Sequence, residues 1–275
     1  MDDCLLSGLC AGAYAAMGAG RGAGPGLSLD VGAVVAPLLV AGVAVLVGAL
    51  VQSAVGLGLA LLAAPVMTLL DPTVMPGALQ VLAFVLPLLS LASEWRHVDW
   101  RGVRWVLLGR LPGTLAGVWV VKTASPDALA VIIGTMVLVA VALTGSAVSV
   151  ARTPRTLALA GAVAGVTGTA TSIGGPPVAL VYQSAKGPQI RATLALCFAA
   201  GALLSMTALA AGGELPARAL LTGAVLLPFV FAGFAVAGSL RRRLDGGRIR
   251  IAVLAVAAAS AVALIVRGLW WNALT

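Results

Sequence analysis

Residues 156–185 read TLALAGAVAGVTGTATSIGGPPVALVYQSA and contain no charged side chain. Two full membrane crossings need about 40 helical residues, so these thirty residues, roughly 45 Å of helix, are too few for two crossings. Gly174-Gly175-Pro176-Pro177 interrupts the run, because a glycine pair ends one helix and proline fits the first turn of the next. We therefore predict a helical hairpin that enters and leaves the membrane on one side, with its turn at membrane depth.

The rest of the chain has the composition of a membrane protein. Its 275 residues are 61% hydrophobic and 9% charged, whereas soluble domains carry about 25% charged residues. A chain this apolar cannot cover a water-facing surface, so we expect it to span a lipid bilayer. The net charge of +8 lies in short basic clusters between apolar runs, which favours the positive-inside pattern over a nucleic-acid surface.

The apolar runs follow the same plan in two halves. We expect a flexible N-terminal extension at 1–30, a first membrane repeat at 31–153 and a second at 154–275. The uncharged run at 31–70 corresponds to the opening run of the second half, and it either crosses the membrane twice or forms a re-entrant hairpin. Further segments are expected at 76–93, 103–121, 128–150, 192–211, 216–239 and 249–268. Matching residues are Leu111-Pro112 with Leu227-Pro228, Ala78, Leu82 and Phe84 with Ala192, Leu196 and Phe198, and Gly48 and Gly58 with Gly165 and Gly175.

Basic residues indicate the orientation. If the loop at 96–104 is cytoplasmic, a hairpin at 156–185 places the five arginines of 241–250 in the cytoplasm as well. A single crossing would put that cluster outside, so we reject it. Corresponding loops then lie on opposite sides. The predicted fold is an all-α polytopic bundle of two inverted repeats with broken or re-entrant hairpins and about 8–10 membrane segments.

The helix break of the second half has the groups of an anion site. A helix start presents unpaired N–H groups and its dipole favours an anion. Irregular backbone at membrane depth is tolerated only where it is buried in protein or lines a cavity. The alternative is a packed break whose hydroxyls bond back to their own helix. The residues expected to bind substrate here are Thr169, Thr171, Ser172, Gly174, Gly175 and Pro176.

The break of the first half is the stretch Gln52-Ser53-Ala54-Val55-Gly56-Leu57-Gly58, which has an amide and fewer hydroxyls. If the repeats are inverted, the two turns would face each other near the membrane midplane. We expect Gln52, Ser53, Gly56 and Gly58 to contribute to the substrate site. The alternative is that the glycines serve ordinary close helix packing.

Three side chains on other segments complete the predicted site. Arg110 lies inside the segment at 103–121, and a charge within a membrane span suggests a function by default. Its alternative is snorkelling to the cytoplasmic edge. Gln80 and Thr193 lie early in equivalent helices, where they would either line the site or form an interhelical hydrogen bond.

Other chemistry finds little support in the sequence. No carboxylate pair, P-loop or Ser-His-Asp set is evident, so we expect neither an enzyme nor a cofactor or metal. Cys4, Cys10 and Cys197 form no C-x-x-C pair. The lack of acidic residues in the middle of the spans argues against a dedicated proton pump. Asp71, next to Pro72, is expected to cap a turn.

At these residues the chain resembles the TauE/SafE sulfite exporter family, also called TSUP. The resemblance covers about 31–270. The usual first-half glycine cluster is partly replaced here by Gln52-Ser53-Ala54-Val55. The resemblance implies a bacterial, archaeal or plant membrane protein linked to sulfite, sulfoacetate, thiosulfate and related anions. The residues that carry it are Gly56, Gly58 and Pro65, then Gly168-Thr169 with Gly174-Gly175-Pro176, and the helix start Arg191-Ala192-Thr193.

The leading hypothesis is a secondary transporter of a small sulfur-containing or carboxylated anion, working by alternating access around the two turns. Its partners would be the anion, the lipid bilayer of the bacterial inner membrane and a coupling proton or ion, with nucleic acid excluded. One alternative is an integral-membrane enzyme such as a transferase or thiol relay. Another is a membrane assembly or sensor subunit that does not transport.

Overall fold

The computed structural model describes residues 31–145, 150–240 and 246–274, and all regular structure within them is helical. The first half contains α2 (Val31–Val55), α3 (Leu59–Leu70), η1 (Pro72–Val74), α4 (Gly77–Glu94), η2 (Trp95–His97), α5 (Trp100–Thr123) and α6 (Pro126–Gly145). The second half contains α7 (Pro154–Thr171), α8 (Gly175–Tyr182), α9 (Gly187–Ala211), α10 (Ala217–Leu240) and α11 (Gly246–Leu274). The extension predicted for 1–30 lies outside the described residues, as do Arg241, Arg242 and Arg243.

Several of these helices have the length and composition of membrane spans. Five qualify within the described residues: Val35–Ala54, Gly77–His97, Pro126–Leu143, Gly187–Ala211 and Ala217–Gly238. Large apolar side chains cover the outer faces, including Leu115 at 70% and Trp119 at 67% exposure on α5. Such a surface is unfavourable in water and suits lipid. The predicted all-α polytopic membrane bundle is confirmed.

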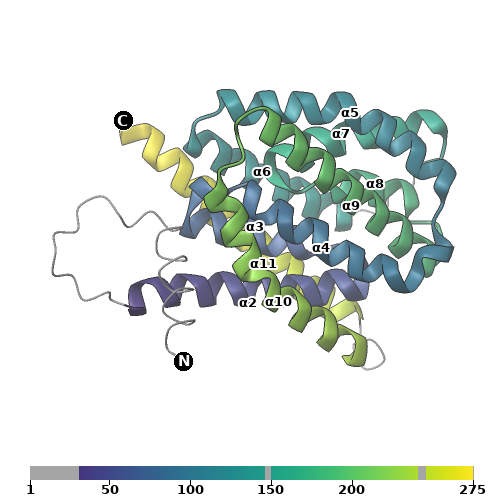
Figure 1. Cartoon of the computed structure of the whole chain (residues 1–275), viewed down its shortest axis with the longest axis horizontal. Helices are drawn as coiled ribbons and strands as arrows, with labels where there is room; N and C mark the ends of the chain where they lie inside the picture. Colours follow the sequence, from purple (N-terminus) through teal and green to yellow (C-terminus); the bar gives the residue numbers. More distant parts are fainter. Residues whose placement is uncertain (1–30, 146–149, 241–245, 275) are drawn as a thin grey trace.

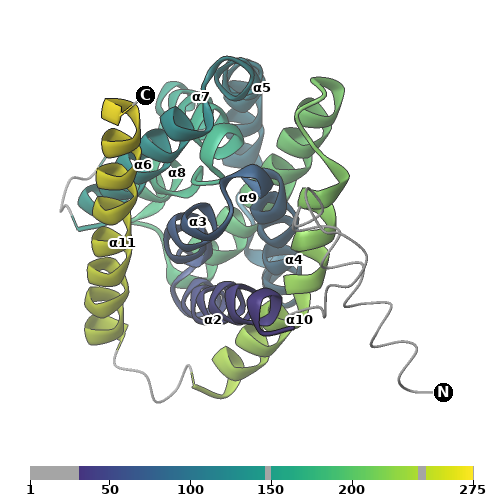
Figure 2. The same ribbon diagram turned by 90° about the vertical axis from the view of Figure 1, so that its left-hand side faces the viewer.

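The two halves pack in the same pattern. Helix α5 packs along α7, and the corresponding α10 packs along α2. Helix α4 pairs with α9 and α6 with α11, while α3 packs on α11 and α8 on α6 (Figure 2). In order along the chain, α2 to α6 correspond to α7 to α11. When each helix is replaced by its counterpart in the other half, every pairing named here becomes another of these pairings. The core is therefore made by helices of both halves.

Corresponding helices run in opposite directions. Glu94 at the end of α4 is hydrogen-bonded to Arg191 near the start of α9, so these two helices are antiparallel. We call this side of the molecule the Arg191 end. At the other side, which we call the Arg218 end, Asp71 after α3 forms an ion pair with Arg218 in the first turn of α10.

Each half opens with a broken hairpin (Figure 1). Helices α7 and α8 form one hairpin that returns to the Arg191 end, where the Tyr182 hydroxyl donates to Asp99 at 3.0 Å. Helices α2 and α3 pack against each other, and α3 ends at the Arg218 end. The predicted turn cap is also present, since the Thr73 N–H donates to Asp71 at 3.0 Å. The hairpins thus approach the centre from opposite ends.

Candidate functional site

The break between α7 and α8 is built by local backbone geometry. Ser172 ends α7 in the left-handed region, with φ 61°, and its N–H donates to the Gly168 carbonyl at 3.0 Å. Gly175 begins α8, with Pro176 in the first turn, where proline's missing N–H costs no helical hydrogen bond. A Cβ atom on Gly175 would lie 2.9 Å from Cζ of Phe198, so the close packing here requires glycine.

The break between α2 and α3 uses glycine and an amide cap. Gly56 has φ 93°, which a residue with a side chain rarely adopts. The Gln52 side-chain oxygen accepts from the Leu59 N–H at 3.1 Å. This bond satisfies one of the N–H groups left unpaired at the start of α3. Gln52 therefore stabilises the turn from the preceding helix.

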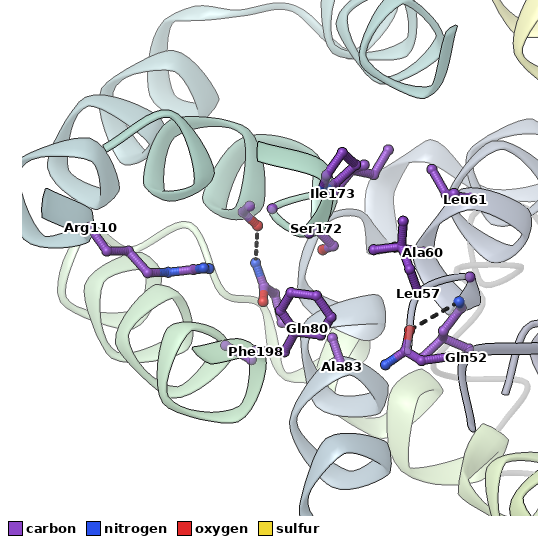
Figure 3. Close-up of a pocket in the computed structure, with 17 residues that line it drawn as sticks. Gln52, Leu57, Ala60, Leu61, Gln80, Ala83, Arg110, Ser172, Ile173 and Phe198 are labelled. Atoms are coloured by element: carbon purple, nitrogen blue, oxygen red, sulfur yellow. Dashed lines mark hydrogen bonds between the residues drawn. The ribbon is translucent and has the colours of Figure 1, made fainter. Parts of the chain in front are cut away.

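Both breaks face one pocket in the interior (Figure 3). The cavity volume is about 40 Å³, which leaves room for about three water molecules. Its lining comes from both halves of the chain. The lining residues are Gln52, Leu57, Gly58, Leu59, Ala60 and Leu61 at the first break, Gln80 and Ala83 on α4, Arg110 on α5, Gly168 and Ser172 to Pro176 at the second break, and Phe198 and Ala202 on α9.

Arg110 supplies the charge of this lining. Its side chain is directed toward Gln80 and the second break (Figure 3), and the residue is only 3% exposed. Three glycines make room for the guanidinium. A Cβ atom on Gly168 would lie 2.6 Å from Nη2, one on Gly174 would lie 3.3 Å from Nη1, and one on Gly201 would overlap the group. The guanidinium therefore stays buried between α7 and α9 and does not snorkel to an edge.

The buried Arg110 has no acidic partner among the described residues, and its Nε makes no hydrogen bond. An uncompensated buried cation is unfavourable. Thr114 lies one turn further along α5, and its Oγ1 is likewise buried without a hydrogen-bond partner. An anion bound in the pocket could offset the guanidinium's charge.

Two hydrogen bonds join the start of α4 to the second break. Gln80 Nε2 donates to the Gly168 carbonyl at 2.6 Å (Figure 3). Ser172 Oγ donates to the Pro76 carbonyl at 3.2 Å. Gln80 is 1% exposed, so this hydrogen bond is shielded from water. Gln80 and Ser172 thus both line the pocket and shape it.

Other predicted residues lie elsewhere. Thr171 Oγ1 donates back to the Thr167 carbonyl at 2.7 Å, and Thr169 bonds Ser205 on α9 at 2.8 Å. Thr193 accepts from the Asp99 N–H at 3.1 Å. None of these three threonines lines the pocket.

Two predicted residues of the first break line a different cavity. Ser53 and Gly56 lie on a smaller cavity beside Arg191, and Ser53 Oγ donates to the Ala49 carbonyl at 2.7 Å. The structure therefore brings together eight predicted residues on the main pocket, namely Gln52, Gly58, Gln80, Arg110, Ser172, Gly174, Gly175 and Pro176.

Sequence reasoning missed two important contributors on α9. Phe198 lines the pocket, and Gly201 leaves space for the guanidinium. The repeat match of Phe198 with Phe84 was a usable signal, whereas Gly201 is one of 34 glycines and has no distinguishing neighbour. No cluster of His, Cys, Asp or Glu that could hold a metal ion occurs in the part of the chain that the structure describes.

The positive charge belongs to one half alone. The match of Leu111-Pro112 with Leu227-Pro228 puts Leu226 at the position equivalent to Arg110. Leu226 is fully buried and packs in the hydrophobic core. The pocket is therefore asymmetric in charge, although the helix packing is the same in both halves.

Comparison with known proteins identifies a family. A family model described as Sulfite exporter TauE/SafE matches residues 39–264, a range that includes both helix breaks and Arg110. No curated protein and no solved structure matches the chain.

Proposed function

The chain belongs to the TauE/SafE sulfite exporter family, and we propose that it moves a small sulfur oxyanion, sulfite or thiosulfate, by alternating access around the two helix breaks. As a multi-pass membrane protein it would reside in the bacterial inner membrane. A proton or ion gradient would drive the transport.

The observation that carries this proposal is the unpaired, buried guanidinium of Arg110 on the pocket lining. The planar guanidinium fork can bind two oxygens of one anion, and such charge-assisted bonds are the strong ones. At the start of α8, Gly174 and Gly175 can add their backbone N–H groups on the same lining, whereas Pro176 and Pro177 have none. A bound oxyanion would supply the negative charge that none of the described residues places beside Arg110.

The size of the pocket favours a compact anion. A cavity of about 40 Å³ holds about three waters, which suits sulfite better than an extended organosulfonate such as sulfoacetate. The apolar part of the lining, with Leu57, Ile173 and Phe198, would exclude water around the anion. We therefore expect sulfite to be preferred over sulfoacetate.

The inverted hairpins provide a route for alternating access. They approach the pocket from opposite ends, so an exchange of conformation between the halves would open the pocket to one end and then to the other. The single charge at Arg110 would remain with the anion in both states.

The test is flux into proteoliposomes that hold the purified protein, with and without a proton gradient. The panel is sulfite, thiosulfate, sulfoacetate, sulfate and a simple carboxylate. We expect saturable sulfite flux in the wild type and none in Arg110→Met. Folded protein that moves none of these anions, or an Arg110→Met variant with unchanged flux, would contradict the proposal.

A further inference from the structure

The smaller cavity lies beside the main pocket, toward the Arg191 end. Gln52 and Phe198 line both cavities and so form a shared wall between them. Figure 3 places these two side chains on the same, lower edge of the substrate pocket. Ser53, Ser90 and Arg191 are the other polar residues on the lining of the smaller cavity. An anion that passed Phe198 would meet Arg191 next.

The Arg191 guanidinium is hydrogen-bonded to the carboxylate of Glu94. Nε of Arg191 donates to both carboxylate oxygens at 3.1 Å, and Nη2 donates to Oε1 at 2.6 Å. The Arg191 side chain is 26% exposed and that of Glu94 is 14% exposed. Arg191 therefore borders the cavity and, together with Glu94, reaches the molecular surface at this end.

The backbone beside the pair supports a role in passage. Gly56 lines the same cavity, and a Cβ atom there would lie 3.5 Å from Cγ of Arg191. Its left-handed backbone, with φ 93°, puts the turn of the first hairpin directly against the Arg191 stem. A movement of that hairpin would therefore change the surroundings of Arg191 and its pairing with Glu94.

We propose that Arg191 is a second binding station for the transported oxyanion, and that Glu94 occupies it while this end of the path is closed. The identity of the anion rests on the proposed function. The carboxylate of Glu94 and the oxyanion compete for the same guanidinium fork. Arrival of the anion releases Glu94 and opens the path, and departure of the anion lets the pair form again.

Closure is tested by labelling a cysteine in the smaller cavity. Ser90→Cys is placed in a chain with Cys4→Ser and Cys10→Ser, while Cys197 is fully buried and stays. A membrane-impermeant maleimide is applied to vesicles of both orientations. Glu94→Gln should raise the labelling rate from the Arg191 end by about fivefold, the shift expected for loss of one ion pair.

The matched control for labelling is Asp71→Asn, which removes an ion pair at the opposite end. It should leave the labelling rate of the Ser90→Cys chain from the Arg191 end unchanged. Arg191→Gln serves as a second way to break the Glu94 pair if Glu94→Gln does not fold. Equal labelling in the parent chain and in a folded variant without the pair would overturn the closure.

The binding role is tested by the KM of anion flux. Glu94→Gln should lower the KM because it removes a competitor, whereas Arg191→Gln should raise it by about tenfold because it removes a charged hydrogen-bond donor. If both variants shift the KM in the same direction, the Arg191–Glu94 pair has only a structural role, and the proposed second binding station is contradicted. A wild type without flux would contradict the proposed function, while the labelling would still decide on closure by itself.

Discussion

The guanidinium of Arg110 fills the space that a side chain on Gly201 would need. A Cβ atom on Gly201 would overlap Cζ, Nε and Nη1 of Arg110. The two residues belong to α5 and α9 in different halves of the chain, and Gly168 on α7 borders the guanidinium from another side. The charged part of the pocket therefore depends on the close packing of three helices.

Gly201→Ala should raise the KM for transport by about tenfold or more, with little loss of fold. The added methyl group must displace the guanidinium from the pocket, and loss of a charge-assisted contact lowers affinity by about tenfold or more. Sulfite flux in proteoliposomes measures the effect. Gly238→Ala on α10 is the matched control, because no atom lies within 4 Å of its added Cβ. Wild-type flux in Gly201→Ala would show that the position of Arg110 is unimportant.

Arg110→Met should remove transport while leaving the protein as stable as the wild type or more stable. The buried Nε has no hydrogen-bond partner among the described residues. Replacing an uncompensated buried charge with an apolar chain of similar shape can stabilise a protein by about 1 kcal/mol or more. Thermal unfolding in detergent reports stability, and flux reports function. A strongly lowered Tm would mean that Arg110 supports the fold through its packing.

Ser172→Gly should give a more stable protein than Ser172→Ala. Both variants lose the hydrogen bond to the Pro76 carbonyl, but only glycine adopts φ 61° without strain. The left-handed conformation costs other residues about 1–2 kcal/mol, so the Tm of the glycine variant should be higher. Identical unfolding curves for the two variants would exclude strain at Ser172.

The short helices of the hairpins are tethered at their bases in equivalent places. Asp71 after α3 pairs with Arg218 on α10, and Tyr182 at the end of α8 donates to Asp99 before α5. Asp71→Asn and Tyr182→Phe should each lower the free energy of unfolding by about 1 kcal/mol. Because the tethers lie at opposite ends, the double variant should show the sum. A double variant no worse than either single one would show that the tethers are coupled.

The membrane class and the helix breaks could be predicted from composition and from neighbouring residues. An apolar chain with few charges requires lipid, and this follows from composition alone. Gly174, Gly175, Pro176 and Pro177 act on the backbone within a few residues, so the start of α8 at Gly175 could be predicted locally. The position of the cap at Asp71 also followed from neighbouring residues.

Helix packing determines which polar groups share the pocket. Thr169, Thr171 and Ser172 carry similar hydroxyls in one short stretch, yet only Ser172 lines the pocket. Thr171 finds an acceptor in its own helix, whereas Thr169 finds Ser205 on α9. Such partners become neighbours only when helices pack, and a sequence pattern does not specify that proximity.

The same reason applies to Arg110. From the sequence, its side chain could equally reach the membrane edge or the interior of the bundle. The choice was made by glycines on α7 and α9, which leave a space of the right shape beside α5. Local rules specify where the backbone breaks, because they act between adjacent residues. The charge at the centre of the pocket is specified by helix packing, because its neighbours come from distant parts of the chain.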